Sequence, residues 1–178
     1  MIARSHNTGQ GLLEAIIAIG IILTATVASL TLIVSSIEAG RGVRERLIAM
    51  NLAREGMEVV HMIRDSNWLA DREWTTGWAL PGGTTNEIPV FASSTPWWQI
   101  AQGITDINAD DTKLYLESGR YVQKVGGIPS GHDSGFRRWI TADVNSTSAY
   151  LVTVQVTYLV RNQTKTLSLQ EHFTNWKP

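Results

Sequence analysis

The fold of this chain is decided by residues 9–34, which read GQGLLEAIIAIGIILTATVASLTLIV. Between Leu12 and Val34 there are 23 residues, and Glu14 is the only one with a formal charge. A helix rises by about 1.5 Å per residue, so this run would be about 35 Å long, enough to cross the core of a bilayer. A carboxylate inside an apolar span is costly unless it is paired or lies near the interface, so Glu14 requires a functional explanation.

A secretory signal peptide is the first alternative for such a run. Signals of that kind end in an A-x-A-like cleavage site after an apolar core of about 7–15 residues. The sequence contains no A-x-A, and its apolar run is longer than such a core. We therefore expect the run to remain in the mature protein as a membrane span.

The start of the chain resembles the class III signal of type IV prepilins and pseudopilins. A short polar leader ends in Gly9, leucines precede the glutamate, and Glu14 follows Gly9 by five residues. The resemblance implies that a prepilin peptidase of the inner membrane cuts between Gly9 and Gln10, and that Gln10 is then methylated on its α-amine. Gln10 departs from the family, which usually has Phe, Met or another apolar residue there. Glu14 would become the fifth residue of the mature chain and an assembly residue, because it can meet the α-amine of a neighbouring subunit.

The same resemblance implies a function. The chain would be a structural subunit, a minor pilin or a pseudopilin, of a type IV pilus or a type II secretion-like filament, and not an enzyme. Its partners would be other pilin or pseudopilin subunits, the prepilin peptidase, the inner-membrane assembly platform and membrane lipid. The formal net charge of −1 gives no bulk attraction to nucleic acid.

The charges beside the span leave its orientation open. Arg4 in the leader favours a cytoplasmic N-terminus, whereas Arg41, Arg44 and Arg46 beyond the span favour the reverse. The resemblance decides between them: a single-pass protein of the cytoplasmic membrane with its C-terminus outside, later part of an extracellular filament.

The helix is predicted to continue beyond the span. Apolar side chains recur at spacings of three and four, as on one face of an α-helix, at Leu47, Met50, Ala53, Met57 and Val60. Gly40 and Gly42 are expected to mark a bend or a melted turn. The predicted segments are a cleaved leader (1–9), a transmembrane and assembly helix (10–36), the outer half of the helix (37–66) and a β-rich globular head (67–178).

The head is predicted to be an antiparallel sheet packed on the outer half of the helix, which makes the fold class α+β and pilin-like. From Lys113 onward apolar residues alternate with polar ones, most clearly from Val152 to Val160, as expected of strands with one buried face. Hairpin turns are predicted at Ser118-Gly119 and at Arg161-Asn162-Gln163. Arg138 interrupts one such apolar run. The chain has no cysteine, so no disulfide can stabilise the head and a hydrophobic core must do so.

Residues 67–112 are predicted to form a long loop with turn signals such as Pro81-Gly82-Gly83. The loop contains five tryptophans, at positions 68, 74, 78, 97 and 98. Exposed indoles would suit stacking on sugars or bases. The simpler interpretation is that they cover the sheet edge and the helix flank, and Arg72 as the loop's only basic residue favours it over nucleic-acid binding.

Two smaller patterns contain residue types that are typical of a metal site or of a hydrolase. Asp106, Asn108, Asp110 and Glu117 stand at positions 1, 3, 5 and 12 of a calcium-type loop, although position 6 is not glycine. The alternative is an acidic turn before a strand. Residues 131–135 bring Ser, His and Asp together, but without the nucleophile elbow of a hydrolase, so a polar turn is expected.

The sequence is therefore compatible with three classes of function. They are a structural filament subunit, a single-span anchored binding domain that never assembles, and a surface hydrolase. Leader processing and incorporation into filaments separate the first from the second.

Overall fold

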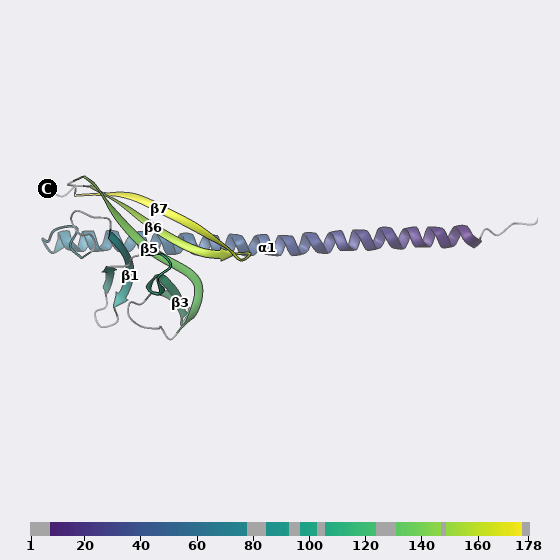
Figure 1. Ribbon diagram of the computed structural model, residues 1–178, viewed down its shortest axis with the longest axis horizontal. Coiled ribbons are helices and arrows are strands. Elements are labelled where there is room, and N and C mark those ends of the chain that lie inside the picture. The colour runs from purple at the N-terminus through teal and green to yellow at the C-terminus, as the bar shows by residue number, and fades with distance from the viewer. Residues whose placement is uncertain are drawn as a thin grey trace, which may run out of the picture. The chain divides into compact units, whose positions relative to one another are not determined.

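The computed structural model describes residues 8–77, 85–92, 97–102, 106–123, 131–146 and 149–175. The chain divides into two units, Met1–Val43 and Arg44–Pro178. The second unit contains the last part of the helix and the whole sheet (Figure 1). From here on we call this unit, residues 44–178, the head; it includes helical residues that lie outside the predicted head of residues 67–178. A long apolar N-terminal helix and an antiparallel sheet confirm the predicted α+β class.

The helix α1 runs from Thr8 to Leu69. Its assignment is unbroken at Gly40 and Gly42, so the expected melted turn is wrong. A glycine costs about 1 kcal/mol relative to alanine in a helix, which does not offset the helical preference of the residues on both sides.

The helix ends at Leu69, slightly later than the predicted end at residue 66. Asn67 is buried, and its side-chain amide donates to the carbonyl oxygens of Trp74 (3.3 Å) and Thr76 (2.8 Å). The backbone N–H of Arg72 returns to the Asn67 carbonyl at 2.9 Å. Asn67 therefore remains in the helix and ties down the segment that follows it.

The head contains one seven-stranded sheet in which every pairing between the described strands is antiparallel. The long strand β5 is central, with β6 on one edge and β1 and β3 one after the other along the opposite edge. A short 3₁₀ helix, Asp110–Thr112, precedes β3. The strands are β1 (Thr85–Ala92), β2 (Trp97–Gln102), β3 (Lys113–Glu117), β4 (Arg120–Val122), β5 (His132–Ser146), β6 (Ala149–Val160) and β7 (Gln163–Thr174).

The prediction of one long loop over residues 67–112 is wrong in its second half, where β1 and β2 form an antiparallel hairpin. Pro89 lies in the middle of β1, opposite Ile100 of β2, although proline has no N–H to donate to a ladder. β1 pairs with β5 only from Thr85 to Glu87, so Pro89 lies beyond that ladder and is tolerated.

Both predicted hairpin turns from Lys113 onward are confirmed. Ser118 and Gly119 join β3 to β4 with φ angles of +51° and +80°, and Arg161 and Asn162 join β6 to β7 with +50° and +62°. Two successive residues in the left-handed region form the turn that best matches the twist of paired strands.

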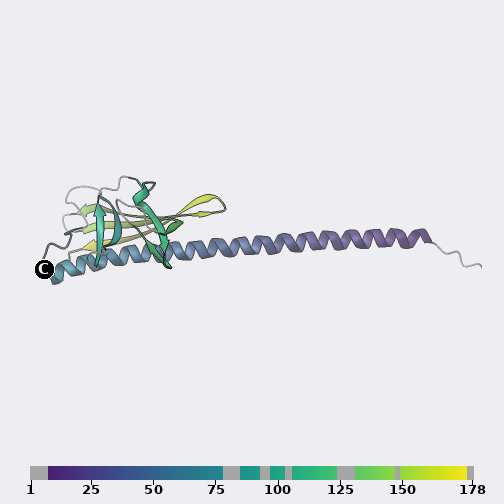
Figure 2. The same ribbon diagram turned by 90° about the horizontal axis from the view of Figure 1, so that it is seen from below.

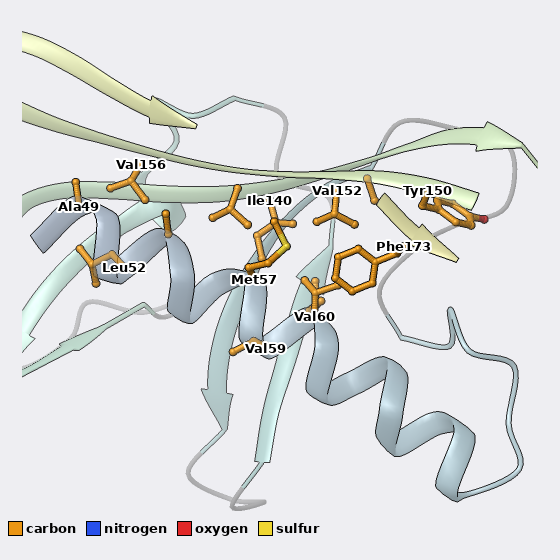
Figure 3. Close-up of a cluster of buried hydrophobic side chains, with 14 of the residues drawn as sticks. Ala49, Leu52, Met57, Val59, Val60, Ile140, Tyr150, Val152, Val156 and Phe173 are labelled. Atoms are coloured by element: carbon orange, nitrogen blue, oxygen red, sulfur yellow. The ribbon is translucent and has the colours of Figure 1, made fainter. Parts of the chain in front are cut away.

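The core lies between the sheet and the part of α1 that belongs to the head (Figures 1 and 2). Figure 3 shows Val156 toward the Ala49 end of this cluster and Phe173 toward the Val60 end. Gly56 lets the two layers approach: a Cβ added there would lie 3.0 Å from Val154 Cγ1 and 3.4 Å from Arg138 Cδ. The predicted packing of the sheet on the outer helix is therefore confirmed within the head.

Met57 and Met62 give a matched test of this packing. Met57 is 4% exposed in the core and Met62 is 40% exposed. We expect Met57→Ala to lower the free energy of unfolding by about 2–5 kcal/mol through lost burial and a cavity. Met62→Ala should change it by no more than about 0.5 kcal/mol. Urea unfolding of the detergent-solubilised chain, followed by tryptophan fluorescence, measures both, and equal effects would contradict this assignment of the core.

Candidate functional site

The first candidate site is the apolar part of α1 in the first unit. Every side chain from Gln10 to Arg41 is exposed. The part of the chain that the structure describes has one helix long and apolar enough to cross a membrane, which is consistent with a single-pass membrane protein. Leu12, Ile22 and Leu32 are representative, each with more than half of its surface exposed. Such a surface requires either lipid or apolar protein around it.

Five of the hydroxyl groups in this segment are satisfied by the helix itself. Each donates to a backbone carbonyl three or four residues earlier, over distances of 2.7–3.1 Å. A polar side chain in hydrocarbon needs such a partner, because no water is present to provide one. The segment can therefore enter an apolar environment without an unpaired hydroxyl at Thr24, Thr26, Ser29, Thr31 or Ser35.

The predicted cleavage site and Glu14 lie close together at the start of α1. Gly9 and Gln10 belong to its first turn, and Glu14 follows Gln10 by four residues. Residues four apart share one face of a helix, so Gln10 and Glu14 are neighbours on it. Glu14 is exposed and has no charged partner in the segments that the structure describes. Residues 1–7, the rest of the predicted leader, lie outside those segments.

The four predicted calcium ligands do not converge. The carboxylate of Asp106 accepts hydrogen bonds from the Asn108 side chain at 3.1 and 3.2 Å. Asp110 Oδ1 pairs with Lys113 Nζ at 2.7 Å, and Glu117 lies at the opposite end of β3 from Lys113. Within the described ranges no three His, Cys, Asp or Glu residues are grouped so that they could hold a metal ion.

Two basic side chains lie against the predicted calcium loop. Arg137 Nη1 donates to the carbonyl oxygens of Asn108 and Ala109, both at 2.9 Å. The hydrogen bond and charge of Lys113 hold the pKa of Asp110 below its usual value, and Asp110 in turn raises the pKa of Lys113. The segment therefore has the geometry of the alternative interpretation, an acidic turn before a strand.

Residues 132–135 begin the strand β5 and do not form the separate turn that was expected. Ser134 Oγ donates to the Leu114 carbonyl, and Asp133 Oδ1 accepts from the Gly135 N–H at 2.8 Å. The pairing of β3 with β5 shifts register at this point. These polar groups therefore satisfy the backbone of a β-bulge.

Trp68 and Trp74 are buried in the core, and Trp98 packs against it. The geometry of these three agrees with the interpretation of the tryptophans as core and edge cover. The side chains of Trp78 and Trp97 lie outside the described residues.

A second candidate, which the sequence showed only as an interrupted apolar run, is the buried guanidinium of Arg138. Its Nη1 donates to the Leu52 carbonyl and to Glu55 Oε2, and its Nε donates to Gln123 Oε1, all at 2.9 Å. Gln123 also donates to the carbonyl oxygens of Thr112 (2.9 Å) and Arg138 (2.7 Å). This polar network joins α1 to β5 within the head.

The charge of Arg138 is expensive to bury. The side chain is completely buried, and no described residue accepts a hydrogen bond from its Nη2. Burial lowers the pKa of the guanidinium, and the nearby Glu55 carboxylate opposes that shift. An arginine remains charged in proteins, so Glu55 serves as its counter-ion and not as a proton acceptor.

No protein-family model, curated protein or solved structure matches this chain. Its function must therefore be inferred from its own residues.

The ion pair between Arg138 and Glu55 makes a specific prediction about stability. We expect Glu55→Ala to lower the free energy of unfolding by about 1–3 kcal/mol, below the range for a fully buried pair because water reaches Glu55. Its side chain is 38% exposed. In an Arg138→Met background the same change should cost less than about 0.5 kcal/mol, because no buried charge is left unpaired.

Glu58, exposed one turn further along α1, provides the matched control, and Glu58→Ala should be close to neutral. Urea unfolding of the wild type, Glu55→Ala, Arg138→Met and the double variant gives the coupling energy of the ion pair. An equal cost of Glu55→Ala in both backgrounds would show that the pair adds no stability.

Proposed function

We propose that this chain is a structural subunit, a minor pilin or a pseudopilin, of a type IV pilus or a type II secretion-like filament. The observation that carries the proposal is the fully exposed apolar helix segment with one carboxylate, Glu14, near its start. The class III signal that the sequence resembles also supports it, since that signal shares Glu14 and adds the cleavage position at Gly9.

The exposed apolar segment favours a protein that moves between two environments. From Leu12 to Val34 the helix presents apolar side chains on all sides, which suits lipid. The same surface could be covered by equivalent helices of other subunits, because lipid chains and leucine side chains are similarly apolar. A head with its own core can fold in either case.

Glu14 supplies what apolar packing lacks. Apolar contact is non-directional and permits many axial positions of one helix against the next. A buried carboxylate that must meet one positive charge removes that freedom, as single polar residues do in coiled-coil seams. The α-amine of a neighbouring Gln10, created by the cut after Gly9, is the partner that we propose. Processing and assembly are then linked by one ion pair.

The alternative is an anchored binding domain that never assembles. It accounts equally well for the helix and the head. It gives no role to Glu14 beyond a place near the interface, and none to a cut at Gly9. The two tests that follow separate these functions.

Leader removal is the first test. We expect a cut between Gly9 and Gln10 and a methyl group on the Gln10 amine. Intact mass and the N-terminal peptide of protein from the native cell would show both. Gly9→Leu should block the cut, whereas Gly11→Leu, at a position with open space around its Cβ site, should leave it. The proposal would be contradicted by an uncut Met1 in assembled material. It would also be contradicted by an N-terminus at Ser29, which a secretory signal peptidase would leave by cutting after Ala28.

Assembly through Glu14 is the second test. We expect Glu14→Gln to leave membrane insertion and head folding intact and to lower incorporation into filaments at least about tenfold, as expected for a lost ion pair worth more than about 1.4 kcal/mol. Glu38→Gln, which changes a carboxylate beyond the apolar run, is the control and should assemble normally. The measurement compares sheared filaments with the membrane fraction by immunoblot. Wild-type partitioning of the Glu14→Gln chain would favour the anchored binding domain.

A further inference from the structure

The turn between β6 and β7 is positively charged and has no acidic residue near it in the sequence. Residues 157–168 include Arg161 and Lys165 and contain no Asp or Glu. Both basic side chains are exposed. The two-residue turn at Arg161 and Asn162 holds the end of the hairpin in a defined position.

The direction of β6 places this turn at the Arg44 end of the head. Tyr150 and Val156 on β6 lie toward the Val60 and Ala49 ends of the core, respectively, so β6 runs antiparallel to the helix (Figure 3). Lys165 on β7 pairs with Tyr158, which lies two residues beyond Val156; two strand residues advance the chain by about 7 Å, the length of about four to five helical residues. Lys165 therefore lies near the first residues of the helical segment of the head.

Those first residues add two more positive charges. Arg44 and Arg46 are exposed, while Glu45 between them is half-buried. In the described parts of the chain neither arginine has an acidic partner, and neither does Lys165. The basic end of the head, defined here as Arg44, Arg46 and Lys165, therefore carries a net positive charge even when Glu45 is counted.

The basic end lies close in the chain to the apolar span. Arg44 follows Val34 by ten residues, which is at most about 15 Å of helix. The polar headgroup layer on one side of a bilayer is about 5–8 Å thick and accounts for that part of the roughly 15 Å. The remaining distance is within the combined reach of a long basic side chain and an electrostatic screening length of about 8–10 Å. Negatively charged headgroups are thus within electrostatic reach of the side chain of Arg44.

We propose that Arg44, Arg46 and Lys165 dock the head on anionic phospholipid headgroups of the membrane that residues 12–34 cross. The inference rests on the membrane anchor of the proposed function and not on filament assembly. Each basic residue near an anionic surface favours the docked state by about fivefold. Docking would hold an unassembled subunit against the bilayer until it leaves the membrane.

The absence of cysteine allows a clean labelling experiment on the full chain. Thr164→Cys places a fluorophore beside the β6–β7 turn, and Thr174→Cys places it at the other end of the exposed strand β7. Each chain is reconstituted into vesicles of phosphatidylcholine alone or with added phosphatidylglycerol. A spin label on a trace of lipid headgroups quenches a fluorophore that comes close to the surface.

We expect the Thr164→Cys label to be quenched at least about fivefold more in the anionic vesicles, and the difference to disappear in about 0.5 M salt. The Thr174→Cys label should respond little in either. Changing Arg44, Arg46 and Lys165 together to Gln should abolish the difference. The charge-preserving set Arg44→Lys, Arg46→Lys and Lys165→Arg should retain it.

Three results would overturn the inference. Docking by these charges would be excluded if quenching of the Thr164→Cys label were equal in the two kinds of vesicle. It would also be excluded if the difference remained after the three changes to Gln. Quenching that depends on protein density in the vesicle would assign the surface to a second copy of the chain. Failure of the chain to float with either kind of vesicle would remove the membrane anchor, and the proposed function with it, whereas the first two results leave that function intact.

Discussion

The head depends on the close approach of its sheet to the helix at Gly56. Without a side chain there, Val154 and the stem of Arg138 can lie against the helix. The guanidinium then reaches the Leu52 carbonyl and the Glu55 carboxylate. Because this combination requires one axial position of β5 and β6 on α1, it fixes the register in which the apolar faces meet. Apolar burial supplies most of the stability, and the polar network selects one arrangement.

One helix serves two environments. From Gln10 to Arg41 its side chains are exposed, and five of its hydroxyls donate to its own backbone carbonyls. From Ala49 to Val60 one face is buried under the sheet. The two parts belong to different units, so the head does not need the apolar segment in order to bury its core. This separation suits a subunit whose anchor changes surroundings while its head stays folded.

Two charged residues lie in apolar segments, and they differ in whether the described chain provides a counter-ion. Arg138 finds its counter-ion within the head, at 2.9 Å. Glu14 has no counter-ion in the described chain, although its segment is suited to hydrocarbon. A carboxylate in that position is stabilised only by the interface or by a charge from another molecule. The filament that we propose provides such a charge at the N-terminus of a neighbouring subunit.

The sequence by itself determined the long helix, the α+β class and the sheet of the second half of the head. Those features rest on local periodicity: 23 residues with one charge, apolar spacings of three and four, and alternation from Val152 to Val160. The left-handed turns at Ser118-Gly119 and Arg161-Asn162 were also visible, because hairpin signals are local. The motif at Gly9 and Glu14 indicated a function that the fold alone does not specify.

Other features were decided only by the tertiary structure. The hairpin of β1 and β2 lies in the stretch that turn signals had predicted to be a loop, and Pro89 is tolerated there because the β5 ladder stops before it. The spacing of Asp106 and Glu117 matched that of a calcium loop. Glu117 lies at the far end of β3, which pairs with β5, and is therefore separated from the turn at Asp106. Arg138 appeared only as an interruption of an apolar run. Its partners on α1 lie more than 80 residues earlier in the sequence, and only the packing of the sheet on the helix brings such distant polar groups into contact.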